Sequence, residues 1–391
     1  MPTKQKEDSN RCVLTLPLLT EPWQEHIIEK RFKIIEHLKN QLISIELRKL
    51  KNLQRTKAYK NLIKQIDEFN PDLCILFNNS FYEIRDIVDC PILIYYVDTV
   101  IYTANKSAIK RHPNAYFYIA DNESKNILEK EYHVNPQRIK NIAYFSRVRA
   151  KKEVKENNIV FIGSKFVSSG PNYLTQFLQE KPSLEEKEEF QRALDCLKEY
   201  PFATLEDFVQ AGVITSDKVF KYFDIKYFLM ALSTEKRINV LDAISGLGLK
   251  LYGTSNWISE YFYRSRLSLC FSEKKIYSLE DNEHVYNSAK IGISIGHLQA
   301  KAAFPWRVLD ILNSNACLVS DFHEDFNRVF PKDLFPIYND EYEARKICEY
   351  LLKDEKARLN IVKRSQEFMK THFDVHTFFE EVEKMVSVQL L

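Results

Sequence analysis

The sequence predicts an α/β protein with two doubly wound halves and a helical insertion in the second half. Short apolar segments, rich in β-branched and aromatic residues, alternate with helical segments, which is typical of parallel sheets covered on both faces. The chain has 391 residues, of which 45% are hydrophobic and 28% are charged, so it can bury the cores of about two domains. Two such halves would form a cleft beyond the carboxyl ends of their strands, where ligands bind in sheets of this kind.

The first half is expected to form a Rossmann-like domain over residues 12–150, after a polar tail at 1–11 that we expect to be disordered. A glycine-free helical region at 22–69, which we expect to divide near 54–60, follows the first strand because its apolar residues recur at three- and four-residue steps. A second helix is predicted at 121–134. The predicted strands are 12–16, 72–77, 91–98, 115–120 and 139–145.

The second half is expected to form another Rossmann-like domain over residues 151–375, starting with a strand at 158–164. Residues 165–232 are predicted to be helical, with breaks at three prolines, and we expect them to form a helical insertion. The last segment, 376–391, is expected to be a helix that could cross back to the first domain. The other predicted strands are 249–253, 291–296 and 316–321, and the other predicted helices are 235–248, 279–290, 304–315 and most of 341–391.

The glycine content excludes several classes of nucleotide enzyme. The chain has 8 glycines, the first of them Gly163, where average usage would give about 27. The first 162 residues therefore hold neither a phosphate-binding P-loop nor a G-x-G-x-x-G dinucleotide fingerprint. Gly246 and Gly248 begin such a fingerprint, but Gly253 comes five positions later instead of three. Kinase, P-loop NTPase and ordinary NAD(P) dehydrogenase functions are thus disfavoured.

Charge and cysteine usage favour a cytoplasmic protein with no nucleic-acid partner. The formal net charge is +2, and the seven cysteines are scattered with no C-x-x-C pair, which fits a reducing compartment. The start of the chain is polar, and no apolar run reaches the roughly 20 residues of a membrane span. The basic segment 49–64 is either a solvated helix face or a peripheral contact with an anionic membrane or lipid-linked acceptor.

The strongest candidate site follows the strand that ends at Gly296. A helix is predicted to begin at Phe304 or Pro305 with Arg307 in its first turn, where unpaired N–H groups and the helix dipole attract an anion. A basic residue there opposes the dipole preference, as expected at a functional site, and its planar guanidinium suits phosphate oxygens. Asp310, three residues later on the same face, could accept from sugar hydroxyls. The alternative is a structural ion pair between Arg307 and Asp310.

Two other strand ends are candidates for contact with a nucleotide. Tyr252 and Gly253 end one strand before Asn256 and Trp257, so an aromatic ring and a close backbone could hold a flat base there; a core aromatic is the alternative. The pair Gly163-Ser164 ends another strand, where glycine permits close approach and the serine hydroxyl can donate to a phosphate; an ordinary turn is the alternative.

A general base is sought among three residues. Asp98 ends a strand of the first domain and could act as the base from that side of the cleft, or it could simply cap a helix. His297 and His112 are the other candidates, although a lone histidine is more often structural. We assign no metal site, because His372 and His376 have only one nearby carboxylate and a helix register that breaks between them.

Together these segments resemble the CgeB-like glycosyltransferases of the GT-B group. The resemblance covers about residues 70–164 and 235–390 and is most specific in WRVLDILNSNACLVSDFHEDFNRVF, where Arg307, Asp310 and Asp321 occupy the family's Arg, acidic and Asp positions. The other matching segments are NIVFIGS, RINVLDAISGLGLKLYGTSNW and VYNSAKIGISIG.

The resemblance implies a metal-independent transferase with two Rossmann-like domains, a nucleotide-sugar as donor substrate and no separate cofactor. It would place Tyr252 and Gly253 at the base, Arg307 at the diphosphate and Asp310 at the ribose, with the acceptor, a glycan or lipid-linked hydroxyl, on the first domain. The chain departs from the family at Asp310, where Glu is common, at Asn315, where Gly is usual, and in its helical insertion. These departures leave open an inactive GT-B-like scaffold protein, or a transferase of a non-sugar group.

Overall fold

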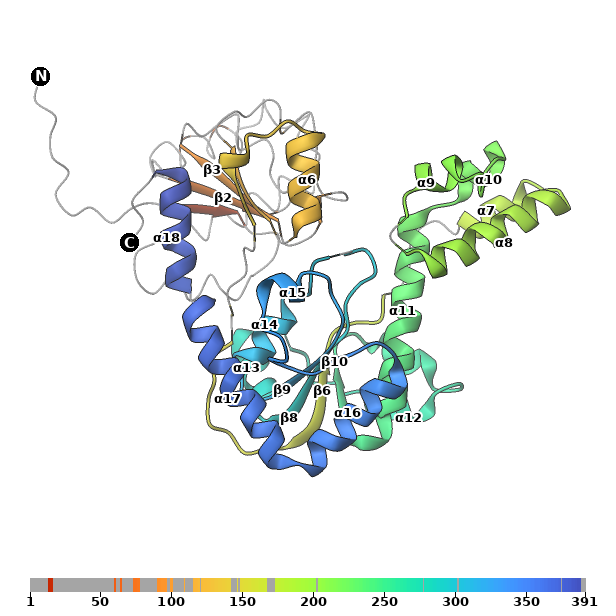
Figure 1. Cartoon of the computed structure of the whole chain (residues 1–391). Helices are drawn as coiled ribbons and strands as arrows, with labels where there is room; N and C mark the ends of the chain where they lie inside the picture. The colour runs from red at the N-terminus through yellow and green to blue at the C-terminus, as the bar shows by residue number, and fades with distance from the viewer. Residues whose placement is uncertain are drawn as a thin grey trace, which may run out of the picture. The chain divides into compact units, whose positions relative to one another are not determined.

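The computed structural model has two compact units (Figure 1), the first made of Met1–Arg147 with Phe368–Leu391 and the second of Val148–Glu367. The residues that the structure describes are 13–16, 60, 64, 73–77, 90–96, 99–100, 109, 115–119, 121–141, 146, 148–166, 173–201, 203–276, 278–300, 302–373 and 375–387. Among these residues no helix is both long enough and apolar enough to cross a membrane.

The first unit is built on a parallel sheet in the order β1-β2-β3-β4-β5. Helix α6 (Asn122–Lys130) begins at Asp121, whose carboxylate accepts from the backbone N–H of Ser124 at 2.6 Å. Helix α18 (Val375–Val386) belongs to this unit, where the Tyr118 hydroxyl donates to Glu381 at 2.8 Å. The strands are β1 (Val13–Leu16), β2 (Leu73–Phe77), β3 (Ile92–Tyr95), β4 (Ala115–Ile119) and β5 (Ile139–Asn141), and a short turn of 3₁₀-helix, η3 (Pro136–Arg138), precedes β5.

The second unit is built on a parallel sheet in the order β10-β9-β8-β6-β7. Its interior strands are almost wholly buried because helices cover both faces. On one face α11 and α16 pack over Phe161, Ile293 and Val319, and on the other face lie α13 and α14. The strands are β6 (Asn157–Ile162), β7 (Leu249–Tyr252), β8 (Ala289–Ser294), β9 (Cys317–Asp321) and β10 (Ile337–Tyr338).

The helices of the second unit fall into two groups. An arm with its own apolar core, which includes Phe177, Phe190 and Phe223, is formed by α7 (Tyr173–Gln179), α8 (Leu184–Glu199), α9 (Leu205–Gln210), α10 (Asp217–Tyr222) and the start of α11 (Ile225–Ile244). The sheet helices are η4 (Ser245–Leu247), η5 (Ser255–Glu260), α12 (Ser265–Leu269), α13 (Leu279–Asn287), α14 (Arg307–Leu312), α15 (Phe326–Val329), α16 (Glu341–Lys353) and α17 (Glu355–His372).

Local sequence explains the arm's helices. Ser183 and Glu186 form a reciprocal capping box at the start of α8, and Thr204 and Asp207 form another at the start of α9. Each box satisfies backbone N–H groups that the first turn of a helix leaves unpaired. The expectation of a helical segment at residues 165–232 is therefore confirmed for α7, α8, α9, α10 and the start of α11.

Several elements differ from the sequence-based expectation, among them α11, α14 and β10. Helix α11 runs through residue 232 without a break, because Ser233 and Thr234 donate their hydroxyls to carbonyls four residues back and so remain compatible with a helix. Helix α14 starts only at Arg307, since Pro305 and Trp306 form a turn before it. The two-residue strand β10 was not predicted, because a segment so short has no recognisable alternation.

Candidate functional site

The second sheet changes direction at β6, which lies between β8 and β7. From β6 the chain passes to β7 on one side and later to β8 on the other, so connections leave the carboxyl ends of these strands in opposite directions. A crevice opens at such a switch point, and ligands of open α/β sheets bind there. The segments that follow β6, β8 and β9 therefore define the candidate site.

Arg307 lies at this switch point. Its Nε donates to the carbonyl of Ile162 at the end of β6 at 3.0 Å, and one terminal nitrogen donates to the carbonyl of Ile295 after β8 at 3.4 Å. The guanidinium also lies 4.8 Å from the centre of the Phe161 ring, which favours the cation. The side chain is partly exposed, so it has donors left for a ligand.

Arg237 of α11 lies beside Arg307, and the sequence-based reasoning did not assign it. One terminal nitrogen donates to the carbonyl of Ser164 at 2.7 Å and the other to that of Ile295 at 3.3 Å, so the two arginines share one acceptor. The guanidinium stacks 3.9 Å from the centre of the Phe166 ring. Burial and the charge of Arg307 both lower the pKa of Arg237.

Neither arginine forms an ion pair with a carboxylate in the described part of the chain, although the charge of Asp321 raises the pKa of Arg237 against the effects of burial and Arg307. The Arg237 side chain is buried, and its Nε has no hydrogen-bond partner there. A buried arginine is usually paired, since an uncompensated charge is costly in an apolar interior. The sequence held one signal for it: Ser233, Arg237 and Leu241 recur at four-residue steps on the buried face of α11.

Asp321, at the end of β9, organises the other side of the switch point. Its carboxylate accepts from Lys236 at 2.6 Å and from the backbone N–H of Gly296 at 2.9 Å, and it contacts His323 Nε2 at 3.1 Å. Burial by itself would raise the pKa of Asp321, but His323 and Lys236 hold it well below its usual range. The ionised carboxylate therefore holds the side chain of Lys236, the residue before Arg237 on α11. It also anchors the loop after β8 through Gly296.

His297 follows Gly296 in that loop and lies against Phe166, with ring centres 4.4 Å apart. Its Nδ1 accepts from the backbone N–H of Gln299 at 2.8 Å, which leaves the proton of the neutral ring on Nε2. Burial, followed by the charges of Arg237 and Lys226, lowers the pKa of His297 to about 4. At neutral pH this ring is thus suited to donate a hydrogen bond from Nε2 rather than to accept a proton.

The glycines at the strand ends serve close packing of the chain itself. A Cβ atom at Gly163 would lie 2.9 Å from a terminal nitrogen of Arg307, so this glycine makes room for the guanidinium. A Cβ atom at Gly253, whose φ is 152°, would collide with the carbonyl of Gly163. A Cβ atom at Gly296 would collide with the His323 ring. Direct approach of a ligand to these backbones stays a prediction.

The residues predicted to lie near the base are largely buried. Trp257 is fully buried, and its Nε1 donates to the Gly163 carbonyl at 2.9 Å, so its ring is part of the core. Tyr252 is buried as well, and burial raises the pKa of its phenol. Asn256 donates to the Lys165 carbonyl at 2.6 Å and thereby fixes the loop after β6. Neither aromatic ring presents a free face for a base in this structure.

The remaining predicted residues divide by exposure. Ser164 is partly exposed in the loop after β6, whereas Asp310 is buried in the first turn of α14, and no ion pair joins it to Arg307 in the described residues. The ion-pair alternative for these two side chains therefore receives no support. Asp98, His112 and the basic segment 49–64, apart from Lys60 and Lys64, lie outside the described residues.

The departure from the family pattern at Asn315 has a structural reason. Its backbone does not adopt a positive φ, so glycine is not needed there. Its side chain donates to the carbonyl of Lys151 and accepts from Gln366 at 2.9 Å. Its own carbonyl accepts from Lys155 at 2.8 Å. The asparagine therefore ties the end of α14 to the start of the second unit.

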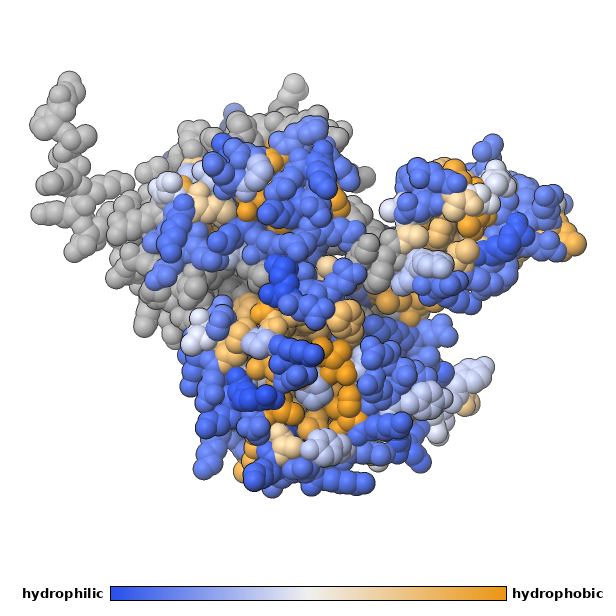
Figure 2. Space-filling model, viewed as in Figure 1, coloured by the Kyte–Doolittle hydropathy of each residue, from blue (hydrophilic) through white to orange (hydrophobic). Residues whose placement is uncertain are grey.

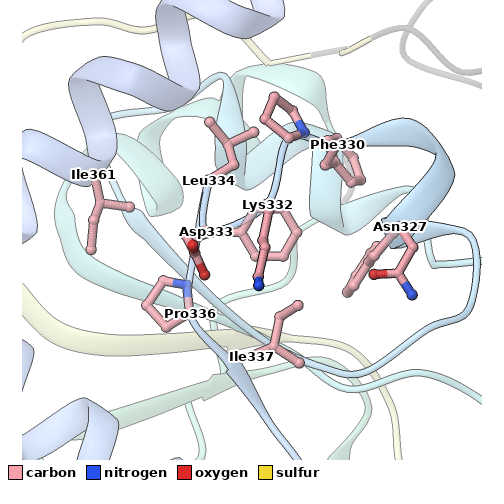
Figure 3. Close-up of a pocket in the computed structure, with 11 residues that line it drawn as sticks. Asn327, Phe330, Lys332, Asp333, Leu334, Pro336, Ile337 and Ile361 are labelled. Atoms are coloured by element: carbon pink, nitrogen blue, oxygen red, sulfur yellow. The ribbon is translucent and has the colours of Figure 1, made fainter.

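A separate cavity of about 700 Å³ lies beside β10 (Figure 3). Aromatic, proline and aliphatic side chains from α15, the following loop, β10 and α17 line it, with Lys332 and Asn327 among its few polar residues. None of the predicted site residues lines this cavity. Within the described residues no cluster of three or more histidine, cysteine, aspartate or glutamate side chains is arranged to hold a metal ion.

Comparison with known proteins places this geometry in context. The glycosyl transferase-like family matches residues 236–384, a span that starts at the Lys236-Arg237 pair and includes Arg307 and Asp321. No curated protein matches the sequence.

Three solved structures share the architecture at low sequence identity. HepE from Anabaena, in complex with UDP and glucose, has a TM-score of 0.53 at 11% identity, over 96% of this chain and 99% of that chain. A glycosyltransferase from Rickettsia africae has a TM-score of 0.53 at 9% identity, over 97% and 98%. Sucrose-phosphate synthase from Thermosynechococcus elongatus has a TM-score of 0.51 at 8% identity, over 87% and 79%.

These findings agree with the two parallel sheets described above. The chain has the GT-B fold, and its residues 236–384 match the glycosyl transferase-like family.

Proposed function

We propose that the protein is a glycosyltransferase that moves a sugar from a nucleotide-sugar to a hydroxyl of a glycan or lipid-linked acceptor. The observation that carries this proposal is the pair Arg307 and Arg237 at the switch point of the second sheet, neither in an ion pair with a carboxylate among the described residues. The charge of Arg307 lowers the pKa of Arg237, so the two cations repel each other. A diphosphate between them would relieve this repulsion.

The same pair suits the chemistry of sugar transfer. When the bond between the anomeric carbon and the diphosphate breaks, negative charge grows on the leaving oxygen, and fixed cations stabilise it more in the transition state than in the ground state. Arg307 is partly exposed and can contact the diphosphate directly. Arg237 is held in place by its hydrogen bond to the Ser164 carbonyl and by stacking on the Phe166 ring. The HepE structure was determined with UDP and glucose, which supports this class of donor.

The finer assignments belong to the proposal as well. We infer a CgeB-like enzyme of bacterial surface polysaccharide synthesis that works in the cytoplasm or at the inner face of the membrane, without a metal ion or separate cofactor. Arg307 takes the diphosphate, Ser164 a phosphate oxygen and Asp98 the role of base if the anomeric configuration inverts. Asp310 would reach a ribose only after a movement that exposes it, since it is buried here.

A binding panel tests the proposal. The full chain would be titrated with UDP, GDP and CMP and their sugar conjugates, by thermal shift and by calorimetry, and product masses would follow with the donor that binds. We expect one nucleotide class to raise the melting temperature of the wild type, and Arg307→Ala to lose most of that shift. Arg192→Ala is the matched control, because it removes an exposed arginine of the arm and should keep the wild-type shift.

The rival functions give different results in the same panel. An inactive GT-B-like scaffold protein would show no stabilisation by any nucleotide. A transferase of another group would bind a nucleotide, but its product would differ from the acceptor by a mass other than that of a sugar. Binding that Arg307→Ala leaves unchanged would contradict the placement of the diphosphate.

A further inference from the structure

An exposed aromatic turn connects η5 to α12, and the proposed donor site does not use it. It comprises Ile258, Tyr261, Phe262, Tyr263 and Leu269, which we call the aromatic patch. Phe262 is 90% exposed and Tyr263 is 86% exposed, so these rings project from the surface and do not line a groove. Figure 2 shows pale and orange side chains where Figure 1 labels α12. Isolated apolar residues are common on surfaces, but such a group in one short segment indicates a binding surface.

Buried and hydrogen-bonded residues beneath the turn keep the aromatic patch at the surface. Trp257 and Leu267 fill the core positions of this segment and are fully buried, so no space beneath the turn remains for the outer rings. The Ser268 hydroxyl donates to the Trp257 carbonyl at 3.1 Å, and the backbone N–H of Tyr263 donates to the Glu260 carbonyl at 3.1 Å. The turn therefore holds its aromatic side chains outside the core of the unit.

Charged residues of both signs surround the patch, with basic residues in excess within the segment itself. The segment from Ile258 to Lys275 contains four basic and two acidic residues. Glu260 pairs with Lys165 at 2.6 Å and with Arg264 at 3.7 Å. Arg264 also lies 3.8 Å from Asp242, and Lys274 lies 3.4 Å from Asp281. Arg266 on α12 and Lys274 and Lys275 after it are exposed. The exposed turn carries phenylalanine and tyrosine, and arginine and lysine follow it in the chain. This composition favours the headgroup layer of an anionic bilayer.

We propose that the aromatic patch binds the surface of an anionic lipid bilayer, with Phe262 and Tyr263 inserted at headgroup level and the basic residues above the phosphates. A second copy of the chain fits the patch less well. A stable protein interface takes about 800 Å² from each partner, and five side chains on one turn supply only part of that area. Rings that stand almost free in water also lack the surrounding rim that shields the centre of a protein interface.

This contact would bring the candidate site close to the membrane. Lys165 in the loop after β6 is bonded to Ser259 and Glu260 of η5, so the patch and the switch point share one rigid connection. A lipid-linked acceptor would then be held near the donor. Vesicle binding by the patch, however, does not depend on glycosyl transfer and can be measured without it.

Flotation with lipid vesicles tests the inference. The full chain would be mixed with vesicles of phosphatidylglycerol and phosphatidylcholine in equal parts, and separately with phosphatidylcholine alone. We expect wild type to bind the anionic vesicles and release as salt rises, because screening weakens the attraction. The double variant Phe262→Ser/Tyr263→Ser should bind roughly tenfold more weakly or worse. Tyr342→Ser on α16 removes another exposed tyrosine, 70% exposed, and should bind as wild type does.

Three results would overturn the inference. The first is no binding of wild type to anionic vesicles. The second is equal binding of the double variant and wild type, which would place any membrane contact elsewhere, for example in residues 49–64. The third is a change of oligomeric state in the double variant, measured by sedimentation, with vesicle binding unchanged; this would assign the patch to a second copy. Both substituted residues are exposed, so the double variant should keep the melting temperature of wild type.

Discussion

The two sheets of this protein look alike but differ in the order of their strands. Each has five parallel strands, but the described strands of the first sheet follow one another in chain order, whereas the second sheet reverses direction at β6. This reversal creates the switch point at which Arg307 and Arg237 lie. The difference teaches that strand content alone does not locate a site; the order of the strands and the charges at their carboxyl ends do.

Glycine usage follows the same division. The first 162 residues contain none, while Gly163, Gly253 and Gly296 follow the ends of second-sheet strands. In the structure these glycines let the chain pack against Arg307, against another backbone and against His323. They therefore contribute to the site by shaping it around the charged groups.

The largest effect is expected on turnover, from Arg307→Ala in the second sheet's switch point. Loss of one preorganised cation that stabilises a transition state lowers kcat by about 10²–10³-fold. Arg307→Lys should recover only part of the rate, since a lysine cannot reproduce the planar fork. The measurement is steady-state turnover with the donor identified by the binding panel, with Arg192→Ala as control. Turnover of Arg307→Ala within a factor of about two of wild type would remove Arg307 from the mechanism.

The next effect concerns the backbone contact at the end of β7. Gly253→Ala should destabilise the protein by about 3 kcal/mol or more, because the new Cβ collides with the Gly163 carbonyl and the φ of 152° is strained for alanine. Gly212→Ala in the arm is the matched control. Its φ is also positive, at 68°, but no atom lies within 4 Å of the added Cβ. We expect about 1 kcal/mol there, from chemical denaturation of both variants. Equal losses would show that the contact at Gly253 contributes nothing.

A pH effect should follow from the neutral state of His297. Its pKa is about 4 in the folded protein and about 6.5 in an unfolded chain. Between these values the unfolded chain takes up a proton that the folded protein does not, so the free energy of unfolding should fall as pH drops from 6.5 to 4.

Substitution of His297 checks this sign. His297→Asn should show a shallower fall in the free energy of unfolding between pH 7 and pH 5 than wild type, by urea denaturation. His133→Asn alters an exposed histidine and should keep the wild-type slope. An unchanged slope in His297→Asn would mean that the ring takes up a proton freely in the folded protein.

The smallest effect is expected in the first unit, which contributes no residue to the switch point described above. Tyr118→Phe removes the hydrogen bond to Glu381 of α18 and should cost about 1 kcal/mol, because Glu381 keeps Lys140 as a partner at 3.1 Å. Nucleotide binding should stay at the wild-type level, which calorimetry can check beside denaturation. A loss of nucleotide affinity would indicate that the first unit contributes more to the donor site than proposed.

The α/β class, the strands other than β10 and the helical arm could be predicted because apolar periodicity and capping residues act over a few positions. Ser183 with Glu186, and Thr204 with Asp207, have the three-residue spacing of a capping box in the sequence itself. The continuity of α11 could not be predicted, because Ser233 and Thr234 resemble a break until their hydroxyls find carbonyls in the preceding turn.

The candidate site was predictable only in part. Arg307 stood out because a cation at a helix start is unfavourable by itself. Arg237 did not, because its significance depends on Phe166, Ser164 and Ile295, which tertiary structure brings together. The burial of Trp257 depends on packing in the same way. Short-range patterns thus identified the sheet edge, and long-range contacts decided which side chains point into it.

The most direct test is a crystal structure of the protein with the nucleoside diphosphate that binds most tightly in the panel. The account predicts the diphosphate at the carboxyl end of the second sheet, within hydrogen-bond distance of the Arg307 guanidinium and close to Arg237. A nucleotide bound among residues 12–145 of the first unit, with Arg307 still held only by the carbonyls of Ile162 and Ile295, would contradict it.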